Sequence, residues 1–183
     1  MRREYVIEVR WTAFPLHPET PEQGTSLEQL FSGRSPADIE NMGQRLKRAA
    51  EEVGLPMGER KYTFNSRLAQ EMSKWAEAEG KGDRFHAALF RTYYADGRNI
   101  GKMEVLVDLA KTLGLFEDKA KSALESGVYR EAVDSDWARC RALNVTAVPT
   151  FMMNDARLVG AQPYAELERF VKSQGAKKRE KVV

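Results

Sequence analysis

The hydrophobic pattern of this chain changes near Val148, and that change limits the folds that it can adopt. Residues 148–153 have the composition of a strand, residues 154–155 that of a polar turn, and residues 158–159 that of a returning strand. Pro163 then opens a final helix with a regular apolar face. The chain is therefore expected to close with a β-hairpin followed by a helix.

Before this change the pattern is almost wholly helical. Apolar residues recur at spacings of three and four from about residue 30 to residue 143. Ser26 and Gln29 have capping-box spacing, and Ser35 followed by Pro36 is typical of a helix start. The long helix predicted after Pro36 carries one apolar stripe, and we expect methionines and aromatic residues at such spacing to belong to a core. That stripe consists of Ile39, Met42, Leu46, Ala49 and Val53.

One strand is expected ahead of the helical block. Residues 5–14 are rich in β-branched and aromatic side chains. Pro15, Pro18 and Pro21 then interrupt both ladder and helix, which predicts an irregular loop ending at Gly24. The predicted order is a strand, a helical block, a hairpin and a closing helix.

Length and charge exclude several function classes. The 183 residues suit one domain, and 29 basic against 27 acidic residues leave no overall field that would select nucleic acid or a membrane. The basic cluster at residues 177–181 has no interleaved aromatic residue, so we expect a frayed, solvated tail. The single cysteine excludes an internal disulfide and a four-cysteine zinc site.

The sequence contains no apolar segment of membrane-spanning character. Glu8 and Arg10 interrupt the apolar run near the N-terminus, so it does not have the form of a secretory signal. No stretch of about 18 apolar residues follows. We therefore predict a cytoplasmic protein.

Four segments carry a resemblance to a known family. Residues 145–151, Val-Thr-Ala-Val-Pro-Thr-Phe, resemble the cis-proline step of the thioredoxin superfamily, and residues 151–163 resemble the strand, hairpin and helix start that follow it. Residues 8–18 look like the family's second strand and turn, and residues 88–100 are similar to a segment of its helical insertion. In this order they resemble DsbA-like oxidoreductases, especially the cytoplasmic FrnE-like branch, over nearly the whole chain.

The resemblance implies an α/β, thioredoxin-like fold with a large all-helical insertion. A single DsbA-like domain would extend over residues 1–183. Its thioredoxin-like core would comprise residues 1–25 and 144–175, and its helical insertion residues 26–143. Residues 176–183 would form the basic tail.

The departure from the family is large. Its first strand and the Cys-x-x-Cys at the start of its first helix would precede Tyr5, where only four residues lie. Without that central strand the sheet has a gap, and each buried unpaired backbone group costs about 1–3 kcal/mol. Three hypotheses follow: an N-terminally shortened oxidoreductase, which we favour, a strand donated by a partner chain, or direct pairing of the flanking strands.

The resemblance also assigns the candidate site. Val148, Pro149 and Thr150 would form a cis-proline loop that aligns an extended substrate through main-chain groups. No catalytic residue and no metal ligand is assigned. Cys140 shares a helical stripe with Val133 and Trp137, and free cysteine is usually buried, so we interpret it as core.

The two histidines show no ligand pattern. His17 lies in a proline-rich loop and His86 on a helix, without a cysteine or an acidic cluster at metal-ligand spacing. We interpret both as solvated or structural.

Three functions stay open. The first is a DsbA-family thiol-disulfide oxidoreductase-like protein that lacks its redox pair in the present form, with thiol or disulfide peptides or proteins as substrates. The second is a glutathione-dependent isomerase or transferase of the 2-hydroxychromene-2-carboxylate isomerase or kappa class. The third is a redox-inert peptide-binding module. Only the second would need glutathione, and enzymatic activity, redox direction and a homodimer are left undecided.

Overall fold

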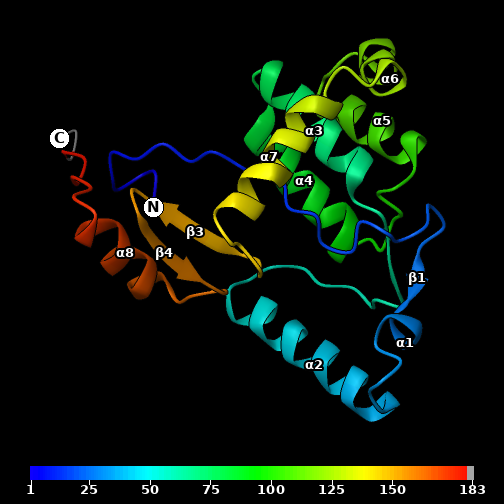
Figure 1. The fold of residues 1–183 in the computed structure, drawn as a ribbon, viewed down its shortest axis with the longest axis horizontal. Coiled ribbons are helices and arrows are strands. Elements are labelled where there is room, and N and C mark those ends of the chain that lie inside the picture. The colour runs from blue at the N-terminus through cyan, green and yellow to red at the C-terminus, as the bar shows by residue number, and fades with distance from the viewer. Residues whose placement is uncertain (181–183) are drawn as a thin grey trace. The chain divides into compact units, whose positions relative to one another are not determined.

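The structure is a computed structural model that describes residues 1–180. Within these residues the chain forms eight helices and four short strands (Figure 1). In chain order they are β1 (Thr25–Ser26), α1 (Leu27–Leu30), α2 (Pro36–Glu52), β2 (Tyr62–Thr63), α3 (Arg67–Ala78), α4 (Gly82–Tyr94), α5 (Met103–Thr112), α6 (Glu117–Ser126), α7 (Arg130–Ala142), β3 (Thr150–Met153), β4 (Ala156–Val159) and α8 (Tyr164–Ser173).

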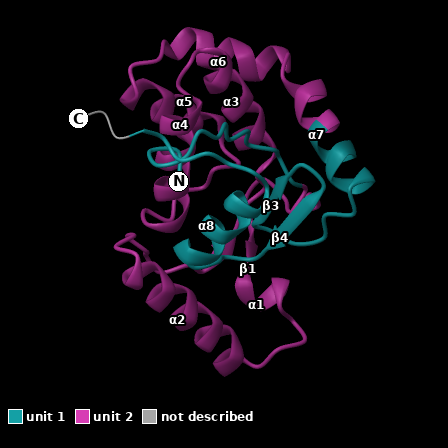
Figure 2. Ribbon diagram, turned by 90° about the vertical axis from the view of Figure 1, so that its left-hand side faces the viewer, with its two compact units in different colours: residues 1–14, 136–183 teal, residues 15–135 magenta. Residues whose placement is uncertain are grey.

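The chain divides into two compact units, coloured separately in Figure 2. Unit 1 consists of Met1–Phe14 and Asp136–Val183, and unit 2 of Pro15–Ser135. The division falls within α7. Unit 1 is thus assembled from two distant parts of the sequence, whereas unit 2 is continuous.

The predicted starts of the first two helices of unit 2 are confirmed. Ser26 caps α1 through its Oγ, which accepts the Gln29 N–H at 3.1 Å, and the Gln29 Oε1 accepts the Ser26 N–H at 3.3 Å. Ser35 caps α2 in the same way, accepting the Asp38 N–H at 3.2 Å, and Pro36 is the first helical residue. These caps satisfy backbone donors that the first helical turn leaves unpaired.

The core of unit 2 is formed by α3 to α6. The apolar stripes of these helices meet with no strand between them, and Met72, Phe85 and Leu106 are fully buried. The predicted burial of the residues at helical spacing is confirmed for the core of this block, but Phe90 of α4 is 48% exposed and corrects the prediction at that position. The core residues are Ala69, Met72, Trp75, Ala76, Phe85, Leu89, Ile100, Leu106, Leu109, Ala110, Ala120 and Leu124.

Helix α2 corrects one expectation. Its apolar stripe is present, but no residue of the helix is buried, and the exposed fractions are 37% for Met42 and 43% for Leu46. Met42 is therefore not a core residue as predicted. An amphipathic pattern defines a face of a helix, and it does not specify which surface covers that face.

The closing hairpin and helix of unit 1 are confirmed. Strand β3 pairs antiparallel with β4, with Thr150 opposite Val159 and Met153 opposite Ala156. Asn154 adopts a positive φ of 52°, as a tight two-residue turn requires. Pro163 precedes α8, and its carbonyl accepts the Glu166 N–H at 3.0 Å.

The predicted strand at residues 5–14 is wrong. Only Tyr5 makes a bridge, to Lys178, and the described part of this segment has no other strand pairing. A strand needs a continuous ladder to a neighbour, and composition alone does not supply that neighbour. The hypothesis of direct pairing with the segment after Val148 fails as well, because among residues 1–180 β3 pairs only with β4.

The beginning of the basic tail is bound rather than frayed, which corrects the prediction for residues 177–179. The Val6 N–H donates to the Lys177 carbonyl at 2.8 Å, and the Arg179 N–H donates to the Glu4 carbonyl at 2.7 Å. Tyr5 lies fully buried beneath these contacts and donates its hydroxyl to Glu168 of α8. Residues 181–183 of the predicted tail lie outside the described residues.

Residues 1–180 contain no helix with the length and apolar character needed to cross a membrane.

Candidate functional site

The loop from Ala147 to Thr150 joins α7 to β3 in unit 1. The peptide bond between Val148 and Pro149 is cis. The Thr150 hydroxyl donates to the Ala147 carbonyl at 2.6 Å, and the Pro149 carbonyl accepts the Gly160 N–H at 2.8 Å. The loop is therefore stabilised by one hydrogen bond within itself and by one from Gly160, the residue after β4.

The segment ahead of this loop is fixed by Arg157 of β4. Its guanidinium donates to the carbonyls of Leu143 and Asn144, the latter at 3.0 Å. Asn144 has a positive φ of 49°, which a short polar residue tolerates at the end of a helix. The segment that follows α7 is thus attached to the hairpin by the Arg157 side chain, in addition to the main chain that connects them.

The hydrogen bonding of the hairpin leaves one edge of β3 open. In an antiparallel pair, opposite residues alternate between those that exchange hydrogen bonds and those whose main-chain groups point away. Because Gly160 bonds to Pro149, the groups of Phe151 point toward β4. Those of Thr150 and Met152 point to the other side.

No strand in residues 1–180 occupies that open edge. Val148 makes no main-chain hydrogen bond within the described residues, and its side chain is 45% exposed. Met152 is 38% exposed. The edge therefore offers alternate main-chain donors and acceptors, flanked by apolar side chains, to an extended segment.

Cys140 lies in the packed part of α7, as predicted. It is 6% exposed, and its Sγ donates to the Ala13 carbonyl at 3.5 Å. Burial raises the pKa of the thiol, and the nearby Asp136 carboxylate raises it further. A neutral, buried thiol is a poor nucleophile.

Neither histidine belongs to a metal centre in the described part of the chain. His86 Nε2 lies 3.3 Å from Glu77 Oε1, and burial lowers the pKa of the imidazole. His17 Nδ1 lies 3.6 Å from Glu19 at the surface. Residues 1–180 contain no group of three or more histidine, cysteine or acidic side chains that could hold a metal ion.

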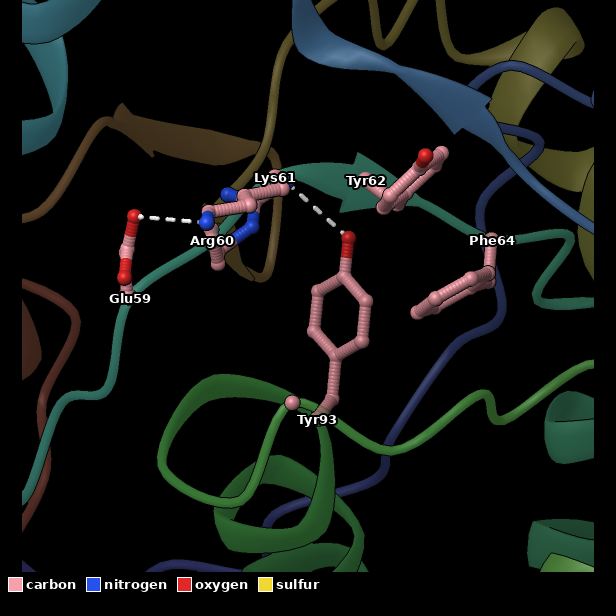
Figure 3. A pocket seen from close by; sticks show the side chains of 7 residues that line it. Glu59, Arg60, Lys61, Tyr62, Phe64 and Tyr93 are labelled. Atoms are coloured by element: carbon pink, nitrogen blue, oxygen red, sulfur yellow. Dashed lines mark hydrogen bonds and ion pairs between the residues drawn. The ribbon is translucent and has the colours of Figure 1, made fainter.

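Sequence reasoning missed a pocket within unit 2, shown in Figure 3. It has a volume of about 170 Å³ and joins the segment around β2 to the last turn of α4. The two segments are some thirty residues apart, so no motif or periodicity indicated that they meet. Its lining residues are Glu59, Arg60, Lys61, Tyr62, Phe64, Tyr93 and Gly97.

Tyr93 is the centre of this pocket. Its hydroxyl accepts a bond from Arg60 Nη2 at 3.0 Å (Figure 3). It also lies 3.3 Å from the hydroxyl of Thr63. The Arg60 guanidinium carbon lies 5.1 Å from the centre of the Tyr93 ring and 5.4 Å from that of Tyr94. The cation is therefore held against two aromatic rings.

A hairpin opened by a cis-proline, followed by a helix and preceded by a helical block, defines a thioredoxin-like class of protein. The family model described as the DSBA-like thioredoxin domain matches residues 1–172. The chain belongs to this DsbA-like family, and the predicted α/β thioredoxin-like fold with its helical insertion is confirmed.

Known proteins of similar sequence or fold agree with this assignment. An uncharacterized protein of Bacillus subtilis (strain 168), YwbO, is 28% identical over 182 residues, covering 94% of this chain and 84% of its own length. A probable DsbA oxidoreductase from Streptomyces coelicolor has a TM-score of 0.80 at 22% identity, over 91% of this chain and 75% of its own. A 2-hydroxychromene-2-carboxylate isomerase has a TM-score of 0.66 at 19% identity, over 83% and 70%.

The chain differs from a dithiol oxidoreductase in its cysteine content. Cys140 is the one cysteine of the 183 residues, so they contain no redox pair. Thiol-disulfide exchange by such a protein needs an attacking thiolate and a second thiol that resolves the mixed disulfide.

Proposed function

We propose that this DsbA-like chain binds an extended thiol- or disulfide-containing peptide at the open edge of β3, through Val148, Pro149 and Thr150, without carrying out dithiol exchange itself. The observation that carries this proposal is the outward direction of the main-chain groups at Thr150 and Met152, next to Val148, which makes no main-chain hydrogen bond within residues 1–180. The general DsbA-like membership of the chain supports thiol or disulfide peptides as the substrate class.

Strand addition supplies the affinity in this proposal. A peptide that lies beside β3 would exchange hydrogen bonds with alternate residues of the strand, each contributing about 0.5–1.5 kcal/mol. Val148 and Met152 would flank it with apolar surface. The Thr150 hydroxyl is already committed to the Ala147 carbonyl, so it holds the loop rather than the ligand.

A second candidate ligand is glutathione. Val148 presents one N–H and one carbonyl next to Pro149, which suits the single cysteinyl residue of that tripeptide. The fold of the 2-hydroxychromene-2-carboxylate isomerase supports keeping this candidate. The peptide is preferred because the open edge continues to Met152, beyond the reach of one residue.

Three narrower proposals accompany the binding site. We propose that the chain belongs to the FrnE-like branch and that residues 1–183 form a single DsbA-like domain, its helical insertion at about 26–143. We also propose a cytoplasmic location, because a single buried cysteine suits a reducing compartment. A homodimer is compatible with these proposals and is decided by a sedimentation measurement.

Binding is tested by titrating the ¹⁵N-labelled chain with a short extended peptide whose central cysteine is S-methylated. The amides of Val148, Thr150 and Met152 should shift and exchange more slowly with solvent, and those of Phe151 and Met153 should change less. N-methylation of the peptide residue opposite Val148 should abolish binding, and N-methylation of the next residue, which points away, should not. Equal effects of the two N-methylations would refute the strand geometry.

Two proline variants distinguish loss of binding at the open edge of β3 from general damage to the hairpin. Met152→Pro removes a donor that points away from β4, and the loss of one bond should weaken the peptide about 2- to 10-fold. Val159→Pro removes the corresponding outward donor of β4 and should leave affinity unchanged. Saturable binding of glutathione together with no binding of the peptide would favour the second candidate instead.

A further inference from the structure

The pocket around Arg60 lies within unit 2, whereas the cis-proline loop lies within unit 1. Main-chain contacts fix the position of the segment that carries Arg60. The Gly58 N–H donates to the Tyr94 carbonyl at 2.8 Å, and a Cβ at Gly58 would lie 2.3 Å from the Ala95 carbonyl oxygen. Only glycine allows this approach, which brings the segment before β2 onto the end of α4 and places Arg60 over the rings.

The charge of Arg60 is not neutralised by any described side chain. Its guanidinium bonds to the Tyr93 hydroxyl, and none of the ion pairs among residues 1–180 includes it. Its Nε is buried without a hydrogen-bond partner. Arginine stays protonated at every accessible pH, and the carbonyl end of α4 offsets only part of that charge.

Lys61 adds a second cation that can be redirected. Its Nζ lies 3.4 Å from Glu59 Oε1, and both side chains are mostly exposed. Such a surface pair contributes little, so Lys61 can turn toward an incoming anion at low cost. The charged groups that line the pocket are thus the fixed guanidinium of Arg60, the mobile ammonium of Lys61 and the mobile carboxylate of Glu59.

The remaining wall is apolar and flat. The rings of Tyr62 and Phe64 are nearly parallel, at 12°, with centres 6.3 Å apart. Figure 3 shows Phe64 beside Tyr93, and both Tyr62 and Phe64 on the chain segment that follows Arg60. A volume of about 170 Å³ is smaller than a drug-sized site, which typically measures about 300 Å³ or more. It suits a small ligand or one end of a larger one.

We propose that this pocket binds the carboxylate of a small organic acid, with its two oxygens on Arg60 and its apolar part against Tyr62 and Phe64. A guanidinium matches a carboxylate because both are planar and can form two parallel hydrogen bonds. One fixed cation balances the single charge of a carboxylate, whereas a phosphate dianion would need more fixed donors. This site does not depend on peptide binding at β3.

The test titrates the 183-residue protein with acetate, benzoate and inorganic phosphate, each against chloride at the same ionic strength. The Nε–H signal of Arg60 is followed by NMR, since this buried group should exchange slowly and shift when an anion pairs with the guanidinium. We expect saturation by both carboxylates, more tightly for benzoate because of the apolar wall. Tighter binding of phosphate than of either carboxylate would overturn the proposal, as would an absence of saturation beyond the chloride control.

Variants assign the effect to Arg60. Arg60→Lys keeps the charge but loses the planar fork, and it should weaken benzoate at least tenfold, which is followed by the backbone amide signals of Lys61 and Tyr62 because the Nε–H is lost in this variant. Arg98→Lys is the matched control, because that guanidinium is already paired with Asp108 at 2.8 Å, and it should bind as the parent does. Tyr93→Phe removes the hydroxyl that holds Arg60 and should weaken benzoate several-fold, which keeps the test valid if Arg60→Lys does not fold. Unchanged affinity in both pocket variants would refute the site.

Discussion

Arg67, the first residue of α3, holds a buried carboxylate, and its replacement should be among the most damaging single changes in unit 2. Its Nε donates to Glu71 Oε1 at 2.7 Å, and Glu71 is 3% exposed. The other oxygen of Glu71 has no hydrogen-bond partner and lies 4.0 Å from Arg130 Nε. Arg67→Met would therefore leave a buried charge with one distant cation.

The expected magnitude follows from the environment of each contact. Breaking a buried ion pair from one side costs about 3–5 kcal/mol. The bond from Arg67 to Asp134 adds little, since Asp134 is 62% exposed. Removing a positive charge from a helix N-terminus stabilises the fold by about 0.3–1 kcal/mol, because that charge is unfavourable beside the helix dipole. We expect Arg67→Met to lower the free energy of unfolding by about 2–4 kcal/mol, out of the 5–15 kcal/mol typical of a domain.

The assay is urea unfolding of the single and double variants, followed by circular dichroism. Arg67→Met combined with Glu71→Leu should be more stable than Arg67→Met alone, because the unpaired charge is removed as well. Arg98→Met, which breaks an exposed pair with Asp108, is the control and should cost less than about 1 kcal/mol. A loss below 1 kcal/mol for Arg67→Met would contradict the reasoning.

Further predictions concern single groups. Burial lowers the pKa of His86 in the folded state, so below about pH 6.5 the unfolded chain takes up the proton first and stability falls; His86→Gln should flatten the dependence of Tm between pH 7.5 and 5.5, and an unchanged slope would be contrary evidence. Ser35→Ala removes the cap of a helix without buried residues, so amide exchange at Asp38 should accelerate about fivefold, for about 1 kcal/mol, while the global Tm stays constant; a matching fall in Tm would show that α2 is part of the cooperative core. Cys140 should react with a thiol reagent only as fast as the chain unfolds, and insulin reduction should show no turnover; rapid labelling of the native protein would overturn its assignment as core.

The sequence predicts local structure well where the signal lies within one turn of a helix. The capping box of Ser26 and Gln29 and the start at Ser35 depend on neighbours three residues apart, and both are confirmed. The cap of α3 shows a limit of this reasoning. Serine is a common N-cap residue, but the Ser66 side chain at the start of α3 makes no cap, and the Asn65 Oδ1 accepts the Arg67 N–H at 2.8 Å instead.

The failures concern partners that are distant in sequence. Residues 5–14 have strand composition, yet within residues 1–180 no strand pairs with them to complete a ladder. The Val6 N–H bonds instead to the carbonyl of Lys177, which lies far along the chain. The Arg60 pocket is likewise formed by segments with no shared period. Composition describes what a segment can become, and tertiary contacts decide whether it does.

The discontinuity of unit 1 has a consequence for the order of folding. Residues 1–14 are synthesised before the helical block, but their contacts, such as Val6 to Lys177 and Glu4 to Arg179, need residues that are synthesised after it. Unit 2 is continuous and helical, and closing a long loop is entropically less costly once that loop has collapsed. Unit 2 should therefore acquire protected amides during translation, whereas residues 4–6 can be protected only after residues 177–179 have left the ribosome.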